Sequence, residues 1–189
     1  MKTVAVILVL LLAGCGGSTP APPVCVCPAS RIPLSSAGGQ IPIAAISTFS
    51  GTLTYPANNA PSDTTLSAAA TTQTGTPLPN GWDSLWLNNP LVSYIFISSK
   101  TVTFNGPLTL AVNMGSHLPA ATSGPGMLEI DVTGFDLTAQ SQYFEASAFQ
   151  SNISGTTVTF SLVTFSGSPF TFVANHIYQA VLNYSYSEP

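Results

Sequence analysis

Short runs of β-branched and aromatic residues, broken by glycine, proline and asparagine, constrain the fold of this chain more than any other feature. The clearest run is 127–133, in which Leu128, Ile130 and Val132 alternate with polar residues. Neighbouring side chains of a β-strand point to opposite faces, so this alternation predicts an antiparallel strand with one buried face. Similar runs predict strands at 41–46, 51–55, 64–72, 91–98, 101–104, 108–112, 127–133, 158–165, 170–172 and 177–186.

Together these runs predict an all-β protein with one folded domain over 39–189. About nine to eleven short strands, without heptads or alternating helices, are typical of an antiparallel β-sandwich or a barrel, and we favour the sandwich. No stretch of the sequence predicts a long helix. Because 45% of the residues are hydrophobic, the domain has enough apolar side chains for an ordinary core.

Two details of the pattern predict how strands are connected. Asn105-Gly106 lies between two β runs and is a strong hairpin-turn dipeptide, although Pro107 leaves the turn type open. Within 158–165 the hydrophobic residues change parity at Val163, which predicts either a bulge or a crossing between sheets.

The N-terminal residues form a separate unit. Lys2 precedes an apolar run over 4–12, which is too short to span a membrane as a helix and is typical of a secretory signal peptide. The run ends in Leu12-Ala13-Gly14-Cys15, which resembles the lipobox of bacterial lipoproteins. The resemblance implies cleavage after a lipoprotein signal peptide at 1–14 and a lipid on Cys15. The alternative is an ordinary secreted protein cleaved near the same place.

Residues 15–38 are predicted to form a Pro/Gly/Ser-rich tether between the anchor and the domain. They show no hydrophobic periodicity, and their prolines favour extended polyproline geometry. A short edge contact is expected at 31–34, where Pro33 argues against a central strand. Gly16 stands where enterobacterial relatives carry the aspartate that retains lipoproteins at the inner membrane. The lipoprotein resemblance therefore implies the outer membrane or the cell surface.

The β patterns are also similar to bacterial surface domains of immunoglobulin-like type, and to the sandwich of the zona-occludens and netrin-receptor families. This similarity rests on 52–57, 64–66, 101–104 and 108–110, and it covers about half of the domain. It implies an architecture and no activity, because one fold serves many functions.

The composition excludes strongly charged partners. Only 5% of the residues are charged, and the chain without Lys2 keeps two cations, Arg31 and Lys100, against seven acids. Nucleic-acid binding requires clustered Lys and Arg to neutralise phosphates, so we exclude it. The expected partners are the membrane, through the lipid anchor, and an envelope protein or polysaccharide.

Two further cysteines, Cys25 and Cys27, lie in the tether with one residue between them. We interpret them as thiols without a catalytic role. A strained disulfide, a bridge to another chain and half of a soft-metal site are the alternatives. No second pair of Cys or His completes a tetrahedral site, so the sequence predicts no metal and no cofactor.

The sequence predicts no catalytic residues and a protein that is not an enzyme. His117 and His176 are the only candidate bases for a serine hydrolase, and neither lies in a recognisable motif. Glu129 and Asp131 share one strand face about 7 Å apart, a spacing that glycosidase carboxylates also show. Adjacent acids on an outward face are nevertheless typical of a solvated surface. Weak calcium binding with Asp136 is an alternative that lacks the usual ligand loop.

The segment 81–89 holds both tryptophans and is the main candidate for a ligand site. Trp82 and Trp86, with Asp83 nearby, could form a platform on which sugar rings stack while polar groups bind hydroxyls. We prefer the simpler interpretation that Trp86 or Leu87 fills one end of the sandwich.

The favoured function is therefore a lipid-anchored extracytoplasmic β-sandwich with a non-catalytic binding or structural role at the cell envelope. The alternative is a carbohydrate-binding surface module that uses Trp82 and Trp86.

Overall fold

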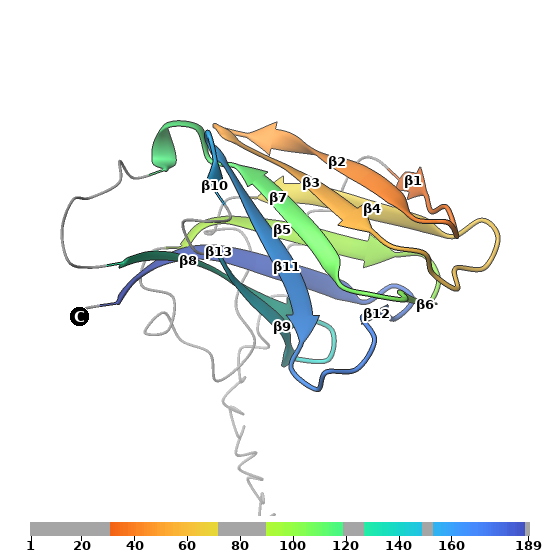
Figure 1. Ribbon diagram of the computed structural model, residues 1–189. Helices are drawn as coiled ribbons and strands as arrows, with labels where there is room; N and C mark the ends of the chain where they lie inside the picture. The colour runs from red at the N-terminus through yellow and green to blue at the C-terminus, as the bar shows by residue number, and fades with distance from the viewer. Residues whose placement is uncertain (1–30, 72–89, 119–126, 149–152, 188–189) are drawn as a thin grey trace, which may run out of the picture.

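The computed structural model describes residues 31–71, 90–118, 127–148 and 153–187. These residues form thirteen strands and one short 3₁₀ helix, η2 (Gly115–His117), and all strand pairings are antiparallel (Figure 1). The strands are β1 (Arg31–Pro33), β2 (Gly39–Ile46), β3 (Phe49–Tyr55), β4 (Thr65–Thr71), β5 (Pro90–Ser98), β6 (Val102–Thr103), β7 (Leu108–Asn113), β8 (Met127–Asp136), β9 (Ser141–Ala148), β10 (Ile153–Ser154), β11 (Thr157–Thr164), β12 (Thr171–Phe172) and β13 (Ile177–Ser187). The prediction of an all-β fold is confirmed. In the described ranges no helix has the length and apolar character needed to cross a membrane.

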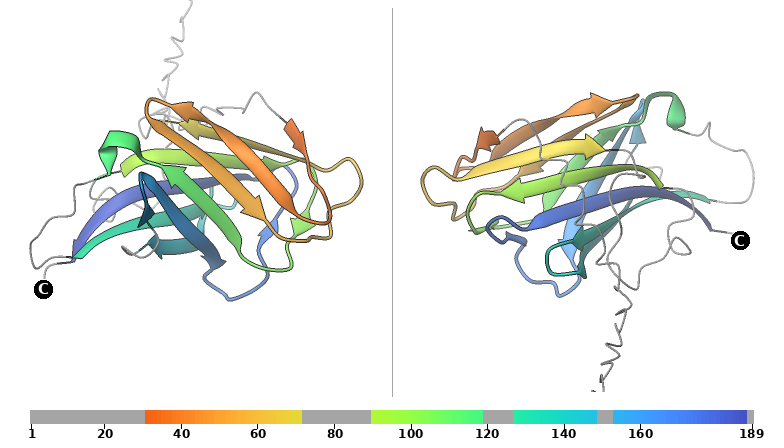
Figure 2. Two further views of the ribbon diagram at one scale, coloured as in Figure 1. Left: turned by 45° about the horizontal axis from the view of Figure 1, so that its top comes forward. Right: turned by 180° about the vertical axis from the view of Figure 1, so that it is seen from behind.

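Eleven of the strands belong to one hydrogen-bonded sheet that folds into two layers (Figures 1 and 2). One layer has the order β1–β4–β5–β13–β8–β9, and the other has β11–β7–β3–β2 with β10 paired to β11. Because β2 lies beside β4, this sandwich is nearly closed into a barrel. β6 and β12 form a separate two-stranded sheet at one end. The predicted antiparallel sandwich is confirmed, whereas this continuous strand order does not confirm the immunoglobulin-like resemblance.

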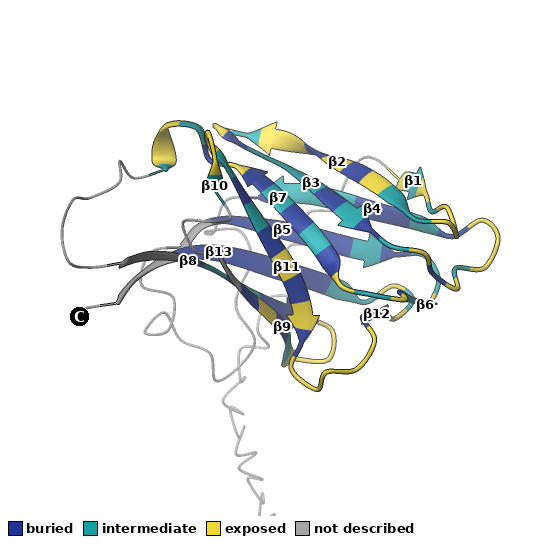
Figure 3. Cartoon of the chain, in the orientation of Figure 1, coloured by how far each residue is buried: buried dark blue, intermediate teal, exposed yellow. Residues whose placement is uncertain are grey.

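β11 joins the two layers, so the predicted crossing between sheets is confirmed. Residues 157–162 pair with β7, whereas Val163 and Thr164 pair with β9. The side chains keep one parity through the crossing (Figure 3), with Thr164 buried and both Val163 and Phe165 51% exposed. The crossing therefore involves no one-residue slip of the strand, and Val163 and Phe165, which break the hydrophobic alternation in the sequence, face outward.

The hairpin predicted at Asn105-Gly106 does not form. β6 pairs with β12, and β7 pairs with β3 and β11, so the dipeptide connects two sheets instead of two neighbouring strands. A type I′ hairpin turn needs positive φ at both central residues, and neither Asn105 nor Gly106 has it. Pro107 follows directly and has no N–H for the first hydrogen bond of a hairpin ladder.

The alternation that predicted β8 is confirmed at the side chains that the structure describes. Ile130 and Val132 are buried in the core, whereas Asp131 and Thr133 on the other face are partly exposed. β8 and β5 flank the long strand β13 on its two sides. The longest pairings of the sheet thus lie in the layer that the clearest sequence pattern predicted.

The edge contact expected at 31–34 is also confirmed. β1 pairs with β4 at the end of the sheet, and the Leu34 N–H donates to the Thr64 carbonyl over 2.9 Å. Further along, the Asn58 side chain donates to the Ser35 carbonyl over 2.9 Å. These contacts hold the chain from Arg31 onward against the sandwich.

Candidate functional site

A cleft of about 430 Å³ opens at the end of the sandwich that carries β6 and β12. We call it the terminal cleft. It is lined by 103–107, between β6 and β7, by 167–170, between β11 and β12, and by 162–164 at the end of β11. Its volume is within the usual range for small-molecule sites.

Backbone hydrogen bonds join the two connections that form the walls of the terminal cleft. The Phe104 N–H donates to the Phe170 carbonyl over 2.9 Å, and the Thr103 and Thr171 hydroxyls lie 3.0 Å apart. Beneath them the Phe172 ring packs against both walls, with its centroid 5.8 Å from that of Phe104 and 5.3 Å from that of Phe170. The terminal cleft is therefore a preformed feature of the packed core.

A tight turn shapes the second wall. The Gly167 N–H donates to the Thr164 carbonyl over 3.0 Å, and the Thr164 hydroxyl donates to the Ser168 carbonyl over 2.7 Å. Gly167 has a φ of +65°, in the left-handed region that favours glycine. The turn leaves the side chains of Val163 and Ser168 at the surface of the cleft.

The described residues that line the terminal cleft are uncharged. It combines apolar side chains, such as Pro107 and Pro169, with the polar side chains of Thr103, Asn105 and Ser168. Among the described residues, neither the Asn105 amide nor the Ser168 hydroxyl has a hydrogen-bond partner, and both residues are exposed. The described part of the site therefore offers free donors and acceptors without a charged or titrating side chain, which suits the binding of a neutral group.

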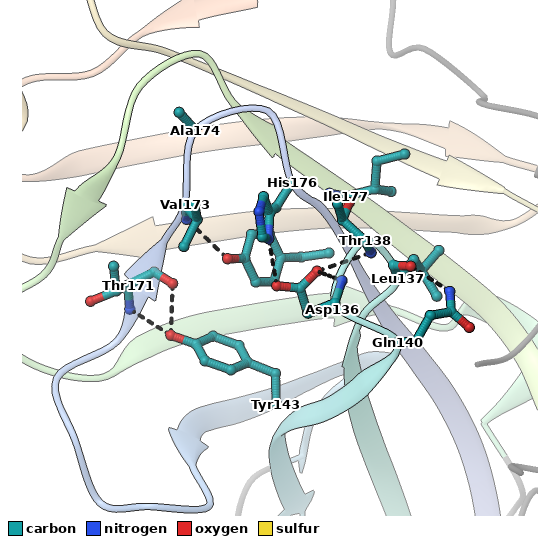
Figure 4. Close-up of polar contacts among 12 residues, drawn as sticks. Asp136, Leu137, Thr138, Gln140, Tyr143, Thr171, Val173, Ala174, His176 and Ile177 are labelled. Carbon is teal, nitrogen blue, oxygen red and sulfur yellow. Dashed lines mark hydrogen bonds and ion pairs between the residues drawn. The ribbon is translucent and has the colours of Figure 1, made fainter. Parts of the chain in front are cut away.

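A second polar cluster surrounds Asp136 at the end of β8 (Figure 4). One carboxylate oxygen accepts the N–H groups of Thr138 over 3.0 Å and Ala139 over 2.9 Å. The other oxygen lies 2.8 Å from Nδ1 of His176, the residue before β13. Asp136 is only 6% exposed, so the turn between β8 and β9 and the loop before β13 meet around a buried carboxylate.

Two tyrosines extend this cluster towards β12 (Figure 4). The Tyr178 hydroxyl accepts the Val173 N–H over 2.9 Å. The Tyr143 hydroxyl accepts the Thr171 N–H over 2.9 Å and donates to the Thr171 carbonyl over 2.6 Å. Burial raises the pKa of Tyr178, and the nearby negative Asp136 raises it further. The pKa of Tyr143 is also raised, mainly by burial.

The contact between His176 and Asp136 resembles the base and orienting acid of a catalytic triad. Within the described parts of the chain, however, no hydroxyl or thiol is hydrogen-bonded to the other ring nitrogen of His176. Neither residue lines the terminal cleft. The arrangement can therefore orient the imidazole and connect two loops. His117, the other candidate base, lies in η2 and stacks on Phe49 with ring centroids 4.7 Å apart.

Several residues that the sequence singled out lie outside the described residues. These are the lipidation site Cys15, the thiols Cys25 and Cys27, and the tryptophan segment with Trp82, Asp83 and Trp86. The side chain of Glu129 is also outside the description, whereas Asp131 is placed on β8 and is partly exposed. Among the residues that the structure places, no group of three or more His, Cys, Asp or Glu side chains is arranged to hold a metal ion.

No family model, no curated protein and no solved structure matches this chain. Function must therefore be inferred from the residues themselves. The sequence carried little signal for the terminal cleft, because its walls come from connections that are distant in the chain. The only visible trace was a turn-forming stretch in each connection, Asn105-Gly106-Pro107 in one and Ser166-Gly167-Ser168-Pro169 in the other.

The domain is expected to lose stability at alkaline pH, because three of its tyrosine side chains are buried or half-buried. The pKa values of Tyr94, Tyr143 and Tyr178 are raised in the folded protein, chiefly by burial. In the unfolded chain these tyrosines have a pKa of about 10. The stabilisation that these protonated tyrosines contribute to the folded state is complete below about pH 10. It is lost as the pH rises towards their pKa values in the folded protein. The midpoint of urea unfolding, followed by circular dichroism, should fall above about pH 10. Tyr178→Phe should reduce that fall, and a midpoint that is flat with pH in the original chain would contradict the prediction.

Proposed function

We propose that this protein is a lipid-anchored lipoprotein of the cell envelope, and that its β-sandwich has a non-catalytic binding or structural role outside the cytoplasm. The observation that carries the proposal is Leu12-Ala13-Gly14-Cys15 directly after the apolar run 4–12. One acyl chain binds a membrane only marginally, whereas the two or more chains of a modified lipoprotein cysteine anchor stably. Gly16 after the cysteine favours the outer membrane or the cell surface.

The fold and the charge of the domain support this role. An antiparallel β-sandwich with 5% charged residues presents a surface of hydroxyl and amide groups, which suits neutral partners and not nucleic acid. The terminal cleft supports a binding function, because it is preformed and carries polar side chains that have no partner among the described residues. The non-catalytic role is supported by the separation of the contact between His176 and Asp136 from this cleft.

Growth with an alkyne-tagged fatty acid tests the proposal. The original chain should incorporate the label, and Cys15→Ser should abolish it, because the acyl group requires the sulfur of that residue. Cys25→Ser and Cys27→Ser are matched controls, since they remove the other two cysteines of the chain and should leave labelling unchanged. Label that persists in Cys15→Ser, or that disappears with Cys25→Ser or Cys27→Ser, would contradict the assignment.

The second candidate function is a carbohydrate-binding surface module that uses Trp82 and Trp86. It is favoured by two tryptophans in one short segment, with Asp83 able to bind sugar hydroxyls. A polysaccharide pull-down should then show binding by the original chain and a loss with Trp82→Ala or Trp86→Ala. No binding, or equal binding by all three proteins, would dismiss the tryptophan platform.

A further inference from the structure

We propose that the terminal cleft binds an uncharged sugar unit, one or two rings of a neutral glycan. This inference rests on the proposed binding role of the domain. It is argued only from residues that the structure describes, and it uses neither lipidation at Cys15 nor a platform formed by Trp82 and Trp86.

The absence of charged side chains from the described lining of the cleft indicates the class of ligand. Among the described residues, no Asp, Glu, Lys, Arg or His lines the terminal cleft. The Lys100 ammonium donates instead to the Ser62 carbonyl over 2.6 Å, and Arg31 lies on β1. An ionic group that entered the cleft would lose hydration without gaining an opposite charge, so a neutral ligand is favoured over a phosphate, a sulfated sugar or a uronate.

The polar side chains of the lining fit hydroxyl groups. The Asn105 amide offers two hydrogen-bond donors and an acceptor, and the Ser168 hydroxyl can both donate and accept. Neither side chain has a hydrogen-bond partner among the described residues. The hydroxyls of Thr103 and Thr164 are already bonded within the walls, so they hold the cleft in shape. A sugar presents several hydroxyls that both donate and accept, whereas a hydrocarbon ligand would leave Asn105 and Ser168 without a bond.

The apolar side chains fit the C–H face of a sugar ring. Pro107, Pro169 and Val163 line the cleft beside the polar groups. Val163 is 51% exposed and is one of three large apolar side chains, with Phe165 and Val173, that the described surface exposes. Together with the two proline rings it gives the cleft an apolar surface against which a sugar ring can pack.

The backbone geometry lowers the cost of binding. The hydrogen bond between Phe104 and Phe170, the turn at 164–168 and the Phe172 ring beneath them fix both walls before any ligand enters. A preformed site avoids the entropy cost of ordering loops on binding. A shallow neutral site of this kind suits a weak ligand with a Kd of about 1 mM, which repeated sugar units along a glycan can strengthen by avidity.

Chemical-shift mapping on the mature chain in detergent tests the proposal, with maltose, cellobiose, lactose and mannobiose as probes. At least one neutral sugar should shift the signals of 103–107 and 162–170, including the side-chain amide of Asn105. Asn105→Ala should weaken its binding about 10-fold, as expected for the loss of good hydrogen bonds to a bound ligand. Val163→Ala should weaken it by a smaller factor through the lost apolar contact. Because both side chains are exposed, these variants should remain folded, which circular dichroism checks.

Matched controls make the outcome specific. Val173→Ala alters the third exposed apolar side chain, which does not line the cleft, and Gln40→Ala alters an exposed amide on β2. Both variants should bind as the original chain does. No shift with any neutral sugar, or unchanged binding by Asn105→Ala and Val163→Ala, would overturn the proposal.

Two further outcomes would overturn it in favour of other sites or partners. A sugar that loses affinity in Trp82→Ala but not in Asn105→Ala binds the tryptophan segment instead. Shifts of the cleft residues by a polyproline peptide, and by no sugar, would assign the cleft to a protein partner. Failure of the anchor is measured separately by the fatty-acid label, so it is distinguishable from failure of the cleft.

Discussion

Gly134→Ala is expected to destabilise the domain by about 3 kcal/mol, because the new methyl group has no space. Gly134 of β8 lies opposite Phe144 of β9, and a Cβ built on its backbone overlaps three atoms of the Phe144 ring. The Phe144 ring is fully buried and packs 5.2 Å from the Phe170 ring, so it cannot move aside without disturbing the core. Urea unfolding of the two proteins measures the difference in the free energy of unfolding.

Gly106→Ala is the matched control for this prediction. Its Cβ would have the Pro56 side chain as nearest neighbour at 3.7 Å, which is an ordinary contact distance, and its φ is not in the left-handed region. The free energy of unfolding should therefore change by less than about 0.5 kcal/mol. Equal stabilities for the two alanine variants would show that β8 and β9 are not packed as described.

Asp136→Ala should cost about 3 kcal/mol, since it removes a buried carboxylate with several partners. The N–H groups of Thr138 and Ala139 would lose their acceptor, and His176 would lose its contact with the turn between β8 and β9. Hydrogen exchange at Thr138 and Ala139 should accelerate more than exchange in β3 or β7. Urea unfolding gives the change in global stability.

His176→Ala separates the role of the carboxylate from that of its contact with the imidazole. The His176 side chain is 28% exposed and makes one of the contacts to Asp136, so its loss should cost only about 1 kcal/mol. The turn amides should stay protected in this variant, because the carboxylate remains. The same loss of protection in both variants would contradict a turn that is held by Asp136 itself.

The local pattern of the sequence was sufficient to predict most of the strands. β4, β8 and β13 were expected from runs of β-branched, alanine and aromatic residues, and their observed bounds differ from the expected ones by only a few residues. β9 was missed because 141–148 contains no Val, Ile or Thr, and its alanines and Glu145 have no strand preference. This segment is a strand because it pairs with β8 and buries Phe144, which are tertiary effects.

The connections between strands were less predictable than the strands. Asn105-Gly106 has the composition of a hairpin turn, yet the strands on its two sides pair with different partners. Val163 continues a hydrophobic run in sequence but points outward, because the strand changes its pairing partner without changing its side-chain parity. Pairing partners depend on the whole sheet, so a local dipeptide or run does not determine them.

The candidate site was the least predictable part of the molecule. The terminal cleft joins connections around 103–107 and 167–170, and the contact between Asp136 and His176 spans 40 residues. Neither has a motif, since proximity arises only when the sheet folds into two layers. Cys15 and the tryptophan segment, which the sequence did single out, lie outside the described residues. Their roles are tested by the fatty-acid label and by the polysaccharide pull-down.

The mass of the N-terminal peptide from the native protein decides between a tethered and an untethered domain. The lipoprotein assignment predicts that this peptide begins at Cys15, lacks residues 1–14 and carries a diacylglycerol thioether with or without a third acyl chain. A peptide that still begins at Met1, or one in which the sulfur of Cys15 is unmodified, would contradict the anchor and the envelope role inferred from it.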